Sequence, residues 1–136
     1  MTKTAVVKLL HDVGGWRGRQ LVQAVQVVLG ESGGNPKARN VNKNGSIDRG
    51  LWQINNKYHP AVSDAQADDP VLATKYARKL YNSRGWAPWY GRSSYARARA
   101  AVVAAGLSPG LHPLALGAAV LAGIYLVRQQ WARRQA

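Results

Sequence analysis

Two residues with carboxylate side chains stand at a spacing that catalysis could use. Glu31 is the one glutamate among 136 residues, and Asp48 follows it seventeen positions later. Cleavage of a glycosidic bond uses such a pair, with one protonated carboxyl for the leaving oxygen and one ionised carboxylate for the sugar cation. An apolar helix end would help Glu31 to keep its proton, whereas the surrounding basic residues would oppose this. For Asp48, a purely structural role in a turn stays open.

Two predicted elements place these carboxylates. Helical periodicity predicts a helix over residues 17–30, so Glu31 lies at its end. Asn44-Gly45 predicts a type I′ hairpin whose returning strand carries Asp48 and continues through residues 50–55. A helix end that faces a hairpin forms two walls of a cleft with one carboxylate on each.

Two further helices complete a mainly α fold with a small β-hairpin. Asp69-Pro70 is typical of a capped helix start and predicts a helix over 71–81. An alanine-rich stretch predicts another over 94–105. The chain is too short for two full domains.

Composition excludes several classes of site. The chain has no cysteine, so disulfides, zinc–thiolate sites and cysteine nucleophiles are excluded. The three histidines show no metal-ligand spacing, and we expect no cofactor and no metal. A net charge of +13 favours polyanionic partners, which include nucleic acid, anionic lipid and anionic wall polymers.

The composition changes near residue 100. Residues 111–127 form a seventeen-residue run whose one polar member is His112. With interfacial aromatic residues and a basic tail, this run predicts a membrane helix over 111–131, although a buried core helix is the alternative. Its small residues would allow contact with another helix. The predicted organisation is therefore a domain at 1–99, a connector at 100–110, the membrane helix and a tail at 132–136, with no cleaved signal peptide at the N-terminus.

Several motifs in order resemble one superfamily. Residues 31–38 (ESGGNPKA) and 50–54 (GLWQI) resemble the Glu-Ser and Gly-Leu-Met-Gln-Ile motifs of the lysozyme-like superfamily, particularly its soluble lytic transglycosylase type. Residues 31–55 also align without a gap on the c-type lysozyme pattern, and 86–89 (WAPW) resemble its Trp-x-x-Trp motif. The resemblance spans about 70 residues, from near Leu21 to Trp89.

The resemblance implies roles for individual residues. Glu31 matches the catalytic acid and Asp48 the second carboxylate of the c-type pattern, which many transglycosylases lack. Gln53 and Asn55 match positions that line the sugar cleft or brace the hairpin, and Trp86 matches a tryptophan beside the acid. Exposed aromatic faces suit pyranose rings, so candidates for sugar stacking or core packing are Trp52, Tyr58, Trp89 and Tyr90.

The implied substrate is the peptidoglycan glycan strand, and two reaction products stay open. A lytic transglycosylase that forms a 1,6-anhydro product is favoured by the motifs, and a hydrolytic lysozyme is the alternative. A third hypothesis is a non-catalytic basic wall-binding or structural membrane protein. With the membrane helix, the sequence favours a bacteriophage particle protein that opens the host wall at entry, with contacts to other virion proteins and no specific nucleic acid, or else a bacterial envelope enzyme.

Overall fold

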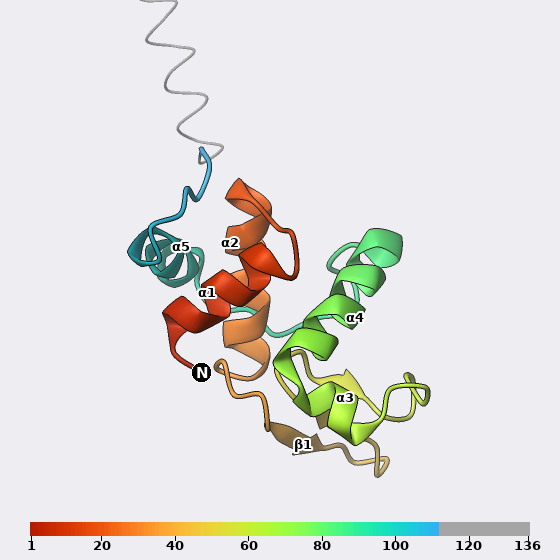
Figure 1. Ribbon diagram of the computed structural model, residues 1–136. Coiled ribbons are helices and arrows are strands. Elements are labelled where there is room, and N and C mark those ends of the chain that lie inside the picture. Colours follow the sequence, from red (N-terminus) through yellow and green to blue (C-terminus); the bar gives the residue numbers. More distant parts are fainter. Residues whose placement is uncertain (112–136) are drawn as a thin grey trace, which may run out of the picture.

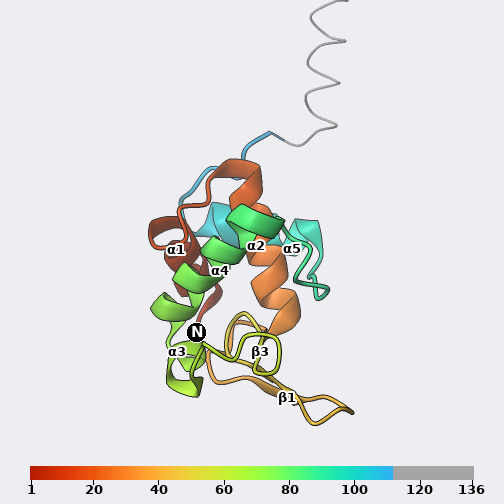
Figure 2. The ribbon, with the colours of Figure 1, turned by 90° about the vertical axis from the view of Figure 1, so that its right-hand side faces the viewer.

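The computed structural model describes residues 1–111, which form a helical body with a small sheet at one end (Figure 1). The elements in chain order are α1 (Lys3–Asp12), α2 (Gly18–Glu31), β1 (Arg39–Val41), β2 (Ile47–Arg49), β3 (Ile54–Asn55), α3 (Asp64–Asp68), α4 (Pro70–Arg84) and α5 (Tyr95–Ala104). The C-terminal end of α2 reaches the sheet, and the β1–β2 hairpin projects beyond the helices (Figure 2). The architecture confirms the expected mainly α fold with a minor β part.

Helix α2 forms the centre of the core. Its apolar residues recur at helical spacing, and Leu21, Val25 and Val28 have no exposed surface. Helix α5 packs along α2 and buries Val102. Helix α1 was not predicted, although Val6, Val7 and Leu10 recur at helical spacing, and it buries these residues against the same core.

A cluster of aromatic side chains joins α4 to the rest of the core. The Trp16 ring lies 5.4 Å from Trp52 and 5.6 Å from Trp86, centroid to centroid, and Trp52 lies 5.2 Å from Trp89. Buried indole N–H groups need acceptors. Trp52 Nε1 donates to Thr74 Oγ1 of α4 at 3.0 Å, which fixes α4 against the segment that precedes β3.

The sheet differs from the predicted hairpin in two ways. Strands β1 and β2 pair antiparallel with Val41 opposite Ile47, so residues 42–46 form the connection instead of a two-residue type I′ turn. The returning strand also stops at Arg49, because Gly50 has φ +71° and starts a turn that leads into β3. A Cβ at Gly50 would lie 1.9 Å from the Ala67 carbonyl oxygen, which explains why the chain turns at a glycine.

The helix ends agree with the capping signals. Asp69 Oδ1 accepts from the N–H groups of Val71 and Leu72, with Pro70 at the first helical position, and α4 continues to Arg84 instead of ending near residue 81. Ser94 caps α5. The short helix α3 was not predicted, although Ser63 and Gln66 form a capping box at its start.

The packed unit extends past residue 99. Ala101 and Val102 of α5 are buried, and Leu107 packs against the core. We therefore propose that the domain ends near Leu107, with a correspondingly shorter connector. Up to residue 111 no helix is long and apolar enough to cross a membrane. The predicted membrane helix over 111–131 and the tail at 132–136 lie, except for Leu111, outside the described residues.

Candidate active site

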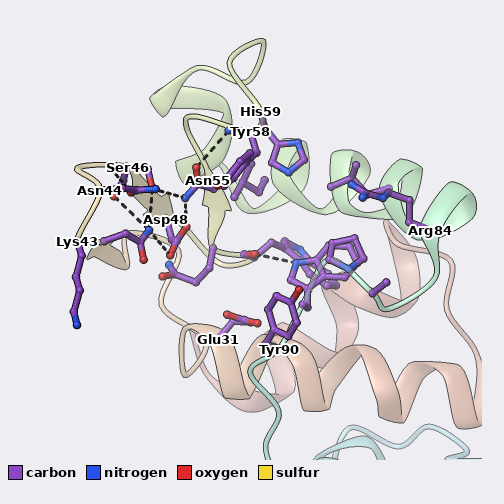
Figure 3. A pocket seen from close by; sticks show the side chains of 18 residues that line it. Glu31, Lys43, Asn44, Ser46, Asp48, Asn55, Tyr58, His59, Arg84 and Tyr90 are labelled. Carbon is purple, nitrogen blue, oxygen red and sulfur yellow. Dashed lines mark hydrogen bonds between the residues drawn. The ribbon is translucent and has the colours of Figure 1, made fainter.

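A cleft of about 940 Å³ lies between the C-terminal end of α2, the sheet, and the segment that follows α4. Both predicted carboxylates line it, Glu31 from the helix end and Asp48 from β2. Figure 3 shows Glu31 and Tyr90 on one side, with Asp48 and Asn55 on the other. The structure thus brings together the two groups selected from the sequence.

Glu31 is the last residue of α2 and is half-buried. Its Oε1 accepts a hydrogen bond of 2.7 Å from the backbone N–H of Gly91. The next residue, Ser32, donates from Oγ to the Leu51 carbonyl at 2.8 Å. This bond ties the Glu-Ser motif directly to the Gly-Leu-Trp motif, so the helix end and the sheet hold a fixed relation across the cleft.

Asp48 is held by three side-chain amides. Oδ1 accepts from Asn55 Nδ2 at 2.7 Å, and Oδ2 accepts from Asn42 Nδ2 at 3.0 Å and Asn40 Nδ2 at 3.2 Å. An ionised carboxylate is an acceptor at both oxygens, so three N–H donors match that form. The arrangement can present a fixed negative charge to the cleft.

Gln53 and Asn55 shape the cleft wall through the backbone. Gln53 is the one described non-glycine residue with positive φ, +49°, and its Nε2 donates to the Gly50 carbonyl at 2.9 Å. Such a conformation is costly and persists where surrounding contacts hold it. Asn55 lies opposite Asp48 in the β2–β3 register, which explains its short hydrogen bond to that carboxylate.

The four aromatic candidates all line the cleft, and they separate into exposed and buried residues. Tyr58 is 68% exposed and Tyr90 93% exposed. Trp52 is fully buried and its ring packs within the aromatic cluster, so of its two candidate roles the structure favours core packing. Trp89 is 6% exposed and donates to the Trp52 carbonyl. Trp86 is not among the residues that line the cleft, and its Nε1 donates to Gln23 of α2 at 3.2 Å.

Two basic side-chain types line the cleft near α4. His59 and Arg84 both line it. Burial, and then the nearby positive charges of Arg84 and Arg49, hold the pKa of His59 below its ordinary value. His59 Nδ1 is 2.9 Å from the Tyr76 hydroxyl, which orients the ring.

Three residues that matter to the carboxylates were missed from the sequence. Asn40 and Asn42 alternate along one strand and its end, a spacing that places two side chains on one face and could have indicated them. Gly91 lies sixty residues from Glu31, and no local signal connects the two.

Comparison with known proteins agrees with the geometry. A family model described as a lysozyme-like domain matches residues 9–91. A lysozyme of Bombyx mori is 33% identical over 97 residues, which cover 61% of this chain and 71% of the relative. A lysozyme of Galleria mellonella is 39% identical over 62 residues, covering 37% and 51%, and lysozyme c-1 of Anopheles gambiae is 36% identical over 78 residues, covering 49% and 56%. With its cleft, its paired carboxylates and a family match over most of the described residues, the chain belongs to the lysozyme-like domain family.

Proposed function

We propose that this chain cleaves the β-1,4 bond between N-acetylmuramic acid and N-acetylglucosamine in peptidoglycan. Family membership makes it a lysozyme-like glycosidase. Glu31 gives a proton to the leaving oxygen, and Asp48 stabilises or traps the sugar cation. Tyr58 and Tyr90 offer exposed rings to the glycan, and Gln53 also lines the cleft.

We propose hydrolysis as the outcome, which makes the chain a muramidase. The observation that carries this choice is the set of three amide donors on Asp48. A negative charge held at the cleft can trap or stabilise the sugar cation until water attacks. The alternative that the motifs favour is a lytic transglycosylase, in which the muramyl 6-hydroxyl captures the cation and no second carboxylate is needed.

The experiment is mass spectrometry of the muropeptides that the full chain releases. Hydrated reducing ends support the muramidase, whereas 1,6-anhydro ends, lighter by one water, support the transglycosylase. Asp48→Asn keeps the size of the side chain and removes its charge, so we expect a loss of at least about 10-fold in rate for a muramidase. An unchanged rate would contradict the role of Asp48.

Glu31→Gln tests the enzyme claim itself against a non-catalytic wall-binding protein. General acid catalysis contributes about 10²- to 10⁴-fold, so zymogram clearing of peptidoglycan should vanish. The variant should still sediment with cell walls, because the described residues carry sixteen lysines and arginines against six acids. Undiminished clearing would end the enzyme claim.

The setting that we propose is a membrane-anchored bacteriophage particle protein that opens the host wall at entry, with a bacterial envelope enzyme as the alternative. Its support is the apolar run that begins at Leu111 and the basic residues that follow it. Anionic wall polymers would attract the basic domain, and this attraction weakens with salt.

A further inference from the structure

The segment 90–93 lies against the last turn and a half of α2. Ser93 N donates to the Gln26 carbonyl at 2.8 Å, and Gln26 Nε2 donates back to the Ser93 carbonyl at 3.1 Å. Between these bonds and Glu31, a Cβ on Gly30 would lie 2.4 Å from the Arg92 backbone nitrogen. The two backbones therefore touch where a side chain on Gly30 would keep them apart.

At the end of this contact, the Gly91 N–H meets the carboxyl of Glu31. The N···Oε1 distance is 2.7 Å, at the short end of the range for N–H···O bonds. A Cβ on Gly91 would lie 2.9 Å from Glu31 Cδ and 3.0 Å from Oε1. Because residue 91 is a glycine, its amide can approach the Glu31 carboxyl without a side chain that would displace it.

We infer that Gly91 is a positioning residue, whose amide fixes the rotamer of Glu31 and selects which oxygen carries the catalytic proton. This inference rests on the proposed function. In a protonated carboxyl the carbonyl oxygen accepts a hydrogen bond better than the hydroxyl oxygen, so the Gly91 amide favours the form with the carbonyl oxygen at Oε1 and the proton on Oε2. Within residues 1–111, Oε2 has no hydrogen-bond partner in the protein and is free for substrate.

The same bond serves both protonation states. Before the reaction the Gly91 amide binds the neutral carbonyl oxygen of Glu31. When the Oε2–H proton passes to the glycosidic oxygen and the C–O bond breaks, Oε1 gains negative charge and the amide stabilises it without moving. The segment 90–93 is bound to α2 and thereby holds the Gly91 amide in place beside Glu31. The same segment carries the exposed Tyr90.

The test is Gly91→Ala in the full chain, measured on soluble, uncrosslinked peptidoglycan strands. The φ of Gly91 lies outside the left-handed region, so alanine can adopt this backbone conformation. Its Cβ would crowd the Glu31 carboxyl at 2.9–3.0 Å and the Gly30 backbone carbon at 3.1 Å. A displacement on the order of 1 Å costs about 100-fold, so we expect kcat to fall 10- to 100-fold, with KM within about twofold of wild type. Arg92→Lys, a neighbouring change that keeps the backbone and the charge, should retain wild-type kcat.

A spectroscopic measurement keeps the inference testable if Gly91→Ala folds poorly. In ¹⁵N-labelled protein the Gly91 amide proton should shift as Glu31 ionises, and this shift should be absent in Glu31→Gln. This measurement tests whether the bond between Gly91 and Glu31 forms in solution, and the separate effects on kcat and KM test the positioning role. If wild type and Arg92→Lys cleave the strands while Gly91→Ala cleaves at wild-type kcat, or if the Gly91 amide does not titrate, the positioning role is wrong and the function stands. If wild type itself cleaves nothing, the proposed function fails instead.

Discussion

Arg49 offers a quantitative test of how the sheet is held in place. It is 3% exposed, beside Asp48 on β2, and its guanidinium donates to three acceptors. Nε donates to the Ile54 carbonyl at 3.1 Å, and Nη1 to the Val62 carbonyl at 2.9 Å and to Asp64 Oδ1 at 2.8 Å. The Asp64 side chain is 75% exposed, so most of the stabilisation by Arg49 comes from its hydrogen bonds to the two backbone carbonyls.

We expect Arg49→Met to lower the free energy of unfolding by about 2 kcal/mol. Each buried carbonyl left without a donor costs about 1–3 kcal/mol, so the two together cost about 2–6 kcal/mol. One compensation is that Nη2 is buried without a partner among the described residues, and its removal returns about 1–3 kcal/mol. Methionine fills much of the volume, so no large cavity adds to the cost.

The assay is urea unfolding followed by tryptophan fluorescence, with the slope m compared among variants. Asp64→Asn is the matched control. It removes the charge of the exposed partner and leaves both carbonyl bonds, so its cost should stay below about 1 kcal/mol. The reasoning is refuted if Arg49→Met unfolds at the wild-type urea concentration, or if Asp64→Asn costs as much as Arg49→Met.

Two further predictions concern pH and the membrane. Because burial and the charges of Arg84 and Arg49 lower the pKa of folded His59, the unfolded chain binds its proton first. The stability contributed by neutral His59 is therefore fully present above the ordinary histidine pKa of about 6.5 and is lost as the pH falls below it. We expect His59→Gln to flatten the dependence of Tm on pH between about pH 7 and 5.5. An equal slope in both proteins would contradict this. The second compares the full chain with a chain that ends at residue 111, by flotation with anionic vesicles in high salt. High salt screens adsorption by charge, so the full chain alone should float, and a full chain that stays at the bottom would exclude a membrane anchor.

The helices that the sequence predicts well are those with local signals. Apolar periodicity predicted α2 and thereby the place of Glu31 at a helix end. The Asp69-Pro70 cap predicted the start of α4, although its end near residue 81 fell one turn short. Helix α1 also has a local signal, since Val6, Val7 and Leu10 recur at helical spacing and are buried, and the prediction overlooked it.

The break between β2 and β3 could not be predicted from local pattern. The hairpin signal at Asn44-Gly45 led us to predict one strand through residues 47–55, but the contacts that end β2 involve residues elsewhere in the chain. The Gly50 N–H donates to the Ala38 carbonyl at 2.8 Å, and its α-carbon packs close to the Ala67 carbonyl. These contacts require the left-handed conformation of Gly50, and they exist only after α3 has packed against β2.

In the candidate site, too, the sequence predicted residue types but not their hydrogen-bond partners. The residue types and their spacing were enough to select Glu31 and Asp48, and the fold places both in one cleft. Residue type left the role of Trp52 open, because an aromatic ring suits a sugar and a core equally, and burial of the ring favours the core. The donors that hold the carboxylates come from other elements, which sequence spacing does not connect.

Those donors explain how two carboxylates in one cleft can take different roles. Asp48 receives three N–H bonds spread over both oxygens, which leaves it suited to present a fixed acceptor to the cleft. Glu31 receives one N–H bond at one oxygen, which leaves the other oxygen able to hold a proton. The difference arises from the elements: strands present several side-chain amides to one face, whereas a helix end meets a single backbone amide of the 90–93 segment. Removing one donor from Asp48, for example by Asn55→Leu, should therefore weaken stabilisation of the sugar cation while Glu31 still donates its proton.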